Sequence, residues 1–219
     1  MKIIDLDKLL PADIPEGERV LWYGRPEWMS LARRAYRADL VVAYFGALAV
    51  WNAVVDSDAG AMAAAIAIGK SMVLGALCLG LLGLLAWLSA RTTLYVITSR
   101  RIVMKVGIAL PIFFNIPYSQ IASAALRTFT DGTGEIPLAL APGRRIALLH
   151  LWPHARPFHI ANPQPALRSI ADVGEVAETL RQAMVAEAQT RLGMANVSAP
   201  VPETASAKQE TYPSGAVAA

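Results

Sequence analysis

Cysteine is nearly absent from this chain of 219 residues: Cys78 is the only one, and it lies within an apolar run. A lone cysteine forms no intramolecular disulfide, so we expect it to be a small buried hydrophobe. Charge is also scarce, at 17% of residues, against roughly 25% in soluble domains. Because 55% of the residues are hydrophobic, we infer that part of the chain lies outside water.

The motifs of common enzyme classes are missing as well. There is no nucleophile elbow and no H-E-x-x-H motif, and the glycines at 132 and 134 predict a hairpin turn, since no phosphate-loop lysine follows them. The histidine spacings of four and five residues, interrupted by prolines, do not fit a zinc helix motif. We expect no enzyme activity, no metal and no cofactor.

Two binding classes are disfavoured by further absences. No lysine-rich arm or zinc-finger spacing indicates a nucleic-acid partner. No histidine occurs between Asp39 and Ala90, which disfavours a pigment held through an imidazole in that region. The net charge of +3 comes with arginines beside the apolar segments, which favours an anionic lipid surface as a partner.

Most of the apolar surplus lies in region 38–90, which we predict to be a transmembrane hairpin. Its helices are expected at about 39–56 and 70–89, joined by a turn with two aspartates. Lys70 at the bilayer centre would cost on the order of 2.5–3.5 kcal/mol, so we place it near the outer interface. Residues 61–69 then either extend the helix outward or lie along the interface.

Basic residues flank this hairpin and set its orientation. Residues 1–37 lack a signal-peptide core and form a cytoplasmic N-terminal segment. By the positive-inside rule, we expect a multi-pass protein with both termini cytoplasmic, which for a bacterial chain means the inner (intracytoplasmic) membrane. The arginines expected at the membrane surface are Arg33, Arg34, Arg37, Arg91, Arg100 and Arg101.

Small residues recur along both apolar segments, several of them four apart. Such spacing lets helices approach closely. They serve either packing within the hairpin or docking of another membrane protein. The candidates are Ala43, Ala47, Ala76, Gly80 and Gly83.

A β-rich cytoplasmic domain is predicted over 91–188. Short strands are expected at 93–99, 101–107, 112–116, 121–130, 135–140, 144–151 and 158–161. An amphipathic helix follows, with Asp172 as its N-cap and Glu175 completing a capping box. Seven strands and a closing helix match a pleckstrin-homology-like (PH-like) barrel or sandwich, one candidate among small β folds. Residues 189–219 are rich in Ala, Pro, Ser and Thr and are expected to be a disordered tail.

Two sets of motifs resemble known families. The runs GERVLWYGRP (17–26) and LYVITSRRIV (94–103) resemble the bacterial PH domain signature around a transmembrane pair. The runs RRA (33–35), DGTGEI (131–136) and HLWPHARP (150–157), with PQP (163–165), resemble the photosynthetic complex assembly proteins of purple bacteria, the PuhB family. The likeness covers about residues 10–185. It implies a non-catalytic factor that helps to assemble the reaction centre and its core light-harvesting complex.

The HLWPHARP run is the strongest candidate site. It is either a structural loop or a partner-binding surface built from His150, Trp152, His154 and Arg156. Its partners would be reaction-centre or core-antenna subunits, and a homo-oligomer is also open. The alternative function is a general membrane-anchored PH-like module that binds lipid headgroups or other membrane proteins.

Overall fold

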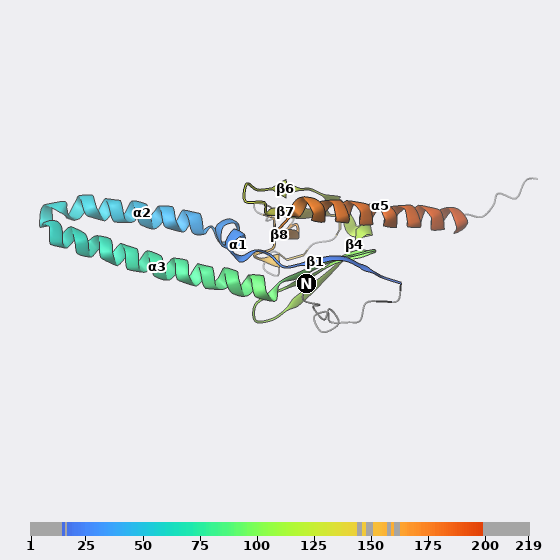
Figure 1. Cartoon of the computed structure of the whole chain (residues 1–219), viewed down its shortest axis with the longest axis horizontal. Helices are drawn as coiled ribbons and strands as arrows, with labels where there is room; N and C mark the ends of the chain where they lie inside the picture. The colour runs from blue at the N-terminus through green and yellow to red at the C-terminus, as the bar shows by residue number, and fades with distance from the viewer. Residues whose placement is uncertain are drawn as a thin grey trace, which may run out of the picture.

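The computed structural model describes residue 15 and residues 17–143, 146–147, 151–156, 159 and 163–198. A long two-helix hairpin projects from one end of a β-rich domain, and a further helix runs across the domain toward the opposite end (Figure 1). The two parts meet around a short helix, α1 (Trp28–Arg34).

The hairpin consists of α2 (Ala38–Val55), η2 (Asp56–Ala59) and α3 (Ala61–Thr92). At 1.5 Å per residue, the 18 residues of α2 span about 27 Å and the 32 residues of α3 about 48 Å. Residues 61–69 continue α3, so of the two alternatives the structure has the extended helix. The helices touch where Phe45 lies on Gly75, and where Asn52 donates a hydrogen bond to Ser71 at 2.8 Å.

Most of this hairpin is left uncovered by the part of the chain that the structure describes. Both helices are long and apolar enough to cross a membrane, and none of the most apolar window of α2 is buried. Large side chains such as Val50, Trp51 and Leu77 are each at least 66% exposed. An apolar surface around the whole helix is typical of a segment whose surroundings are not water.

The domain contains two antiparallel sheets. In the first, strands pair in the order β1-β2-β3-β4, and in the second β7 pairs with β5, β6 and β8. The strands are β1 (Val20–Gly24), β2 (Leu94–Thr98), β3 (Arg101–Val106), β4 (Ile112–Pro117), β5 (Ile121–Ala124), β6 (Arg127–Thr128), β7 (Gly134–Leu140) and β8 (Ala166–Ile170). The described strands form two separate sheets, so of the two predicted alternatives, barrel or sandwich, the structure favours the sandwich.

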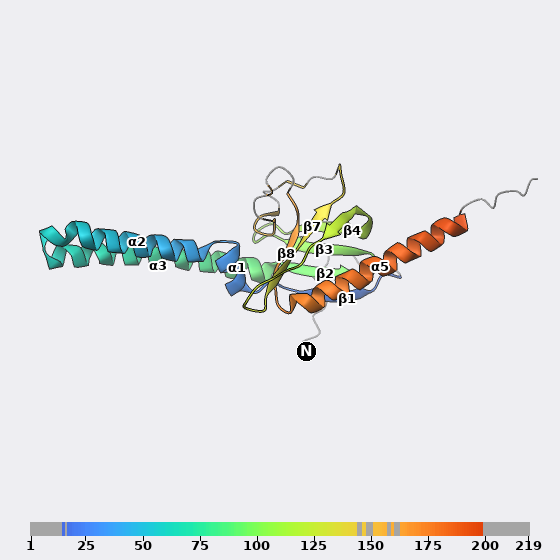
Figure 2. The same ribbon diagram turned by 90° about the horizontal axis from the view of Figure 1, so that it is seen from above.

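A single apolar core lies between the two sheets and the helix α5 (Val173–Ser198). Strand β3 shows how the sequence specifies it, because Ile102, Met104 and Val106 are buried while the alternate residues are half-exposed. The first three turns of α5 bury Val173, Val176 and Leu180 against the sheets. Beyond them α5 projects away from the domain (Figure 2).

Several sequence predictions need correction. Strand β1 comes from the N-terminal segment, β8 was not predicted, and the expected strand 121–130 is broken into β5 and β6. Residues 189–198 continue α5 rather than joining a disordered tail, helped by a Glu187–Arg191 pair four residues apart. Residues 199–219 and most of the strands expected at 144–151 and 158–161 lie outside the described residues. Ile146 and Ala147, which are described, are not in a strand.

Candidate functional site at the hairpin–domain junction

His154 lies at the centre of the contact between hairpin and domain, and its side chain is completely buried. Its Nδ1 is 2.6 Å from the hydroxyl of Tyr95 on β2, and its Nε2 is 3.0 Å from the hydroxyl of Thr93. Ser89, on the last turns of α3, lies 3.4 Å from the same Nε2. One imidazole therefore joins the end of the hairpin to the first strand that follows it.

The neighbours of His154 favour one form of its neutral ring. The Tyr95 hydroxyl accepts the amide hydrogen of Arg168 and lies 2.6 Å from Nδ1, so with Tyr95 as the donor to Nδ1 the proton of the neutral ring sits on Nε2 and points to Thr93. Burial, with a smaller contribution from the Arg168 charge, lowers the pKa of His154 to about 3. Burial also raises the pKa of Tyr95, which stays protonated as this arrangement requires.

A buried ion pair lies beside this imidazole. Arg168 on β8 contacts Glu135 on β7 at 2.8 Å, and each side chain is only 6% exposed. Two further guanidinium hydrogens are donated to the carbonyl oxygens of Pro153, at 3.0 Å, and Arg34, at 3.2 Å. Because a buried charge without partners is costly, these contacts explain why both groups are tolerated in the interior.

The turn before β7 docks on α1. The Thr133 hydroxyl donates to the Asp131 carboxylate at 2.7 Å and so accepts a hydrogen bond from Ser30, at 2.8 Å. Asp131 also pairs with Arg34 at 3.3 Å. The hydrogen bond from Thr133 is the main reason that the pKa of Asp131 lies below its usual value. The DGTGEI run is therefore a docking turn that holds the hairpin.

The candidates in the HLWPHARP run fall into two groups, those on the surface of the domain and one in its interior. Trp152 is 55% exposed and contacts Tyr36 edge-to-face at a centroid distance of 5.2 Å. Arg156 is half-buried and donates to Gln164 at 2.9 Å. The expectation that His154 lies on a partner-binding surface is wrong, because every polar atom of its ring is used inside the protein. His150 lies outside the described residues.

The small residues of the hairpin do not form its internal contact. Ala43, Ala47, Ala76 and Gly80 are exposed and Gly83 is half-buried. The close approach of the helices occurs instead at Gly75, where an added Cβ would lie 3.0 Å from the Phe45 ring. The exposed alanines and glycine therefore remain available on the outer face of the hairpin.

Four of the six arginines expected at the membrane surface lie near the base of the hairpin. Arg91, in the last turn of α3, stacks over Trp87 at 4.8 Å. Arg33, Arg34 and Arg37 line a hollow of about 290 Å³ beside β6, together with Asp39, Arg127, Phe129, Glu135 and Arg168. We call this the basic hollow.

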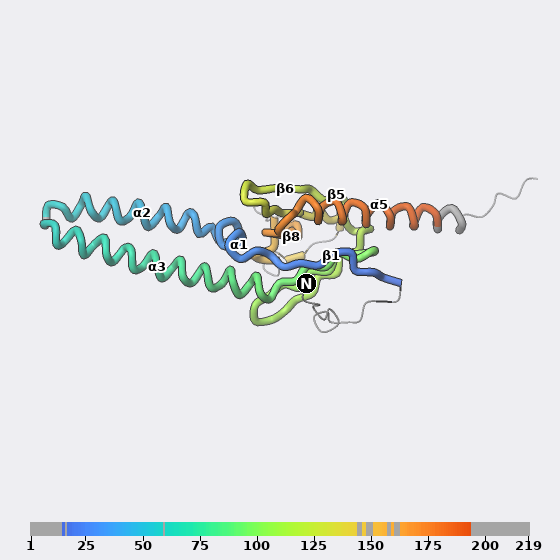
Figure 3. The backbone as a smooth tube through the Cα atoms, in the orientation of Figure 1, coloured from blue at the N-terminus to red at the C-terminus, as the bar shows by residue number. Residues whose placement is uncertain are grey.

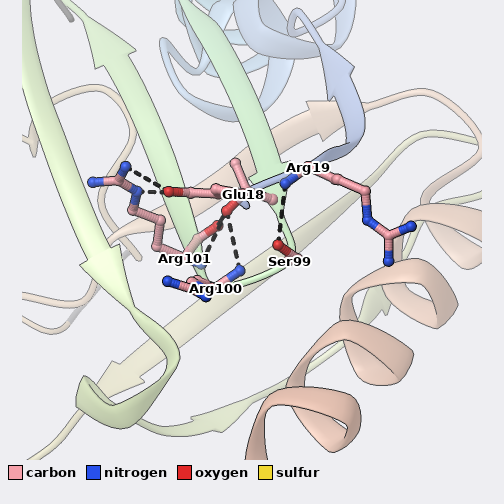
Figure 4. Close-up of polar contacts among 6 residues, drawn as sticks. Glu18, Arg19, Ser99, Arg100 and Arg101 are labelled. Atoms are coloured by element: carbon pink, nitrogen blue, oxygen red, sulfur yellow. Dashed lines mark hydrogen bonds and ion pairs between the residues drawn. The ribbon is translucent and has the colours of Figure 1, made fainter. Parts of the chain in front are cut away.

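Arg100 and Arg101 lie elsewhere, at the far end of strand β2 from the hairpin. Strand β2 starts directly after α3 and leads away from the hairpin, so at 3.3 Å per residue the turn after Thr98 is about 20 Å beyond the helix. There Arg101 makes a two-pronged ion pair with Glu18, at 2.6 and 2.8 Å (Figure 4). Figure 3 traces the chain from this point along β1 back to α1.

A second hollow is apolar. It has a volume of about 510 Å³ and lies between α5 and the β5–β6 connection, where Leu126 and Val185 are half-exposed. Within the described part of the chain, no group of three or more His, Cys, Asp or Glu side chains is placed to hold a metal ion.

Two sheets around a core closed by one helix, joined to an apolar hairpin, define a membrane-compatible PH-like protein. A model of the bacterial PH domain family matches residues 40–184. The chain therefore belongs to the bacterial PH domain family.

Two individual proteins are similar to this chain. It is 35% identical over 181 residues to an uncharacterized 23.7 kDa protein in the puhA 5′ region of Rhodobacter capsulatus, covering 81% of this chain and 85% of that protein. A crystal structure of a DUF1696 family protein with a pleckstrin-homology domain, from Shewanella loihica, is 15% identical with a TM-score of 0.29. The match covers 42% of this chain and 71% of that one.

Proposed function

We propose that this protein is a non-catalytic assembly factor for the photosynthetic reaction centre and its core light-harvesting complex. The observation that carries the proposal is the 35% identity to a protein encoded beside puhA, which hints at a photosynthetic context. The resemblance of the RRA, DGTGEI and HLWPHARP runs to photosynthetic complex assembly proteins points the same way. The client would be a reaction-centre or core-antenna subunit.

In this proposal the hairpin crosses the inner membrane twice with both termini in the cytoplasm. Its tip carries Asp56 and Asp58, while Arg33, Arg37 and Arg91 flank its base. This asymmetry agrees with the positive-inside rule. The stretch from Ser71 to Ala90 spans about 30 Å at 1.5 Å per residue, and leaves Lys70 level with Asn52, near the outer end of α2.

A junction held by buried hydrogen bonds suits an assembly factor. It keeps the outer face of the hairpin, with Ala43 and Ala76, in a fixed relation to the domain surface around Trp152 and Arg156. A client could then be contacted within the membrane and at its cytoplasmic face at once, and two linked contacts bind more tightly than either alone. A homodimer through the same hairpin face would be a competing use of it.

The chemistry of the junction supports a role without catalysis. A general base must reach the substrate and have a pKa near the working pH. His154 is fully buried, and its pKa is about 3. The neighbouring Glu135 is held in a buried ion pair with Arg168. The burial and pairing of these groups suit a structural role better than proton exchange with a bound solute.

The proposal is tested by purifying the tagged full-length protein in mild detergent from a phototrophically grown purple bacterium. Co-purifying polypeptides are identified by mass spectrometry, and the near-infrared absorption of the eluate is recorded. Reaction-centre or core-antenna subunits, enriched over an unrelated two-span membrane protein, are expected. An eluate without subunits or pigment, from membranes that are making complexes, would contradict the proposal and favour the lipid-binding module.

A matched pair of variants tests the surface contact. Replacing Trp152 and Arg156 by Ala is expected to reduce client recovery several-fold. Replacing Leu192 and Arg181 by Ala removes an exposed apolar side chain and an exposed basic one from α5, and should leave recovery unchanged. Equal recovery with both pairs, in folded proteins, would remove Trp152 and Arg156 from the interface.

A further inference from the structure

The basic hollow lies where α1 ends and α2 begins, opposite β6. Five guanidinium groups and two carboxylates line its volume of about 290 Å³. It opens within two residues of Leu40, the first exposed apolar side chain of α2. The arginines that line the hollow outnumber its carboxylates, so some of them lack a partner within it.

Two of the five arginines are already paired. Arg168 is held by Glu135, and Arg34 contacts Asp131, whose carboxylate lies just outside the hollow. The Arg34 guanidinium also lies 3.5 Å above the centre of the Phe129 ring. Even so, its buried Nε has no hydrogen-bond partner in the described structure. One of the residues that line the hollow thus keeps an unused donor.

The other three arginines are not neutralised. Within the described part of the chain the guanidinium groups of Arg33 and Arg37 make no hydrogen bond or ion pair, and that of Arg127 only faces the Phe129 ring at 5.3 Å. Asp39 is the one lining carboxylate without a basic partner. Three like charges around one small hollow repel one another, and a bound anion would relieve that repulsion.

The chemistry of the lining specifies the anion. Guanidinium groups form paired, charge-assisted hydrogen bonds with phosphate oxygens, and several of them around one centre are typical of phosphate recognition. The hollow is also level with the start of α2, which in a membrane-spanning hairpin is the depth of lipid headgroups. Basic pockets at this depth are suited to anionic headgroups.

We propose that the basic hollow binds the phosphate of an anionic phospholipid headgroup, with Arg33, Arg37 and Arg127 as its principal ligands. This goes beyond the proposed assembly function and does not depend on it. The proposal is also more specific than a general attraction of the flanking arginines to the membrane, because Arg91 and Arg100 lie outside the hollow. One lipid, not a diffuse layer, is the ligand.

The test titrates the full-length protein in neutral detergent with phosphatidylglycerol, phosphatidylcholine of the same chain lengths, or inorganic phosphate. Native mass spectrometry counts the bound lipids and gives their affinity. One tightly bound phosphatidylglycerol is expected, with phosphatidylcholine at least about tenfold weaker because it carries no net charge. Equal binding of the two lipids would overturn the proposal, as would displacement of phosphatidylglycerol by inorganic phosphate at equal concentration.

Two variants with the same loss of charge distinguish specific binding in the hollow from attraction by the overall charge of the protein. Replacing Arg33, Arg37 and Arg127 by Gln is expected to weaken phosphatidylglycerol binding at least about tenfold. Replacing Arg19, Arg91 and Arg100, which are exposed and outside the hollow, should weaken it less than about twofold. An equal loss in the two variants would show that only the overall charge matters. Near-ultraviolet circular dichroism checks that both are folded.

Discussion

At the scale of single residues, the neutral side chain of His154 makes hydrogen-bond contacts with three other side chains. It meets α3 through Ser89, the connection to β2 through Thr93, and β2 itself through Tyr95. Tyr95 passes the contact on to the backbone of Arg168 in β8. Removing one member of such a buried network leaves the others without partners, and that penalty exceeds the gain from the original bond.

Replacing His154 by Phe should therefore destabilise the protein by about 1–3 kcal/mol, the cost of leaving a buried polar partner unsatisfied. Gln can accept from Tyr95 and donate to Thr93, so His154→Gln should lose less. The free energy of unfolding in mild detergent, followed by near-ultraviolet circular dichroism, checks the order. Equal stability of wild type and the Phe variant would mean that the network contributes little to the junction.

The same residue predicts how stability depends on pH. The unfolded chain binds a proton at His154 below a pKa of about 6.5, whereas the folded protein resists protonation down to about 3. The unfolded state therefore holds more protons in this window, and stability falls as the pH falls. The expected slope is about 1.4 kcal/mol per pH unit between pH 6 and 4.

His154→Gln serves as the control for this effect. Its stability should change little between pH 6.5 and 5, because the pKa values of Glu18 and Asp131 are lowered and these carboxylates titrate further down. Unfolding measured at half-unit pH steps gives both curves. Parallel curves for wild type and variant would show that His154 does not titrate on unfolding.

At the scale of elements, one ion pair anchors β1 in addition to its backbone pairing with β2. Glu18 precedes the strand and is paired with Arg101 at the start of β3. Burial would raise the pKa of Glu18, but hydrogen bonds from Arg101 and Thr98 outweigh it and hold the pKa below its usual value. The pair therefore fastens the N-terminal strand to the edge of the first sheet, at the end away from the hairpin.

Replacing Glu18 by Gln should loosen β1 without unfolding the domain. We expect faster amide hydrogen exchange in residues 20–24, by about tenfold for a loss of about 1.4 kcal/mol. Arg100→Gln is the matched control, since it alters a charge in the same turn that is exposed and makes no ion pair in the described structure. Unchanged exchange in the Glu18 variant would assign the anchorage to backbone pairing alone.

How far the sequence predicts these elements depends on how local their partners are. The β2–β3 hairpin is confirmed because its alternation and turn lie within one short stretch, and α5 begins directly after Asp172 as its capping pattern indicates. Strands β1 and β8 were missed because their partners lie far along the chain. β1 pairs with β2 more than 70 residues later, and β8 pairs with β7 about 30 residues earlier.

The site was harder to predict for the same reason. The HLWPHARP run was recognisable as special, but the sequence could not show that His154 is buried. Its partners Ser89, Thr93 and Tyr95 are about 60 residues away, and each is unremarkable in its own segment. In contrast, the arginines before α2 could be singled out as a group, because charge beside an apolar run is a local pattern, and Arg33, Arg34 and Arg37 do line one hollow.

At the scale of the whole molecule, the exposed apolar hairpin and the charges at its two ends together predict on which side of a membrane each end lies. If the hairpin crosses the membrane twice, the turn at Ser57 and the turn at Arg100 lie on opposite sides. The domain end with Arg100 would be cytoplasmic, about 20 Å beyond the end of α3 by strand length. The tip at Ser57, between Asp56 and Asp58, would face the periplasm.

Single cysteines measure this directly. With Cys78 replaced by Ala, Ser57→Cys should react with a membrane-impermeant maleimide in spheroplasts, because both the turn and its side chain are exposed. Arg100→Cys, equally exposed in the structure, should react only after the membrane is permeabilised. Reaction of both positions in intact spheroplasts would place the domain outside the cytoplasm. If neither position reacts there, while both react after permeabilisation, the hairpin does not cross the membrane, and its apolar surface must be covered by another protein.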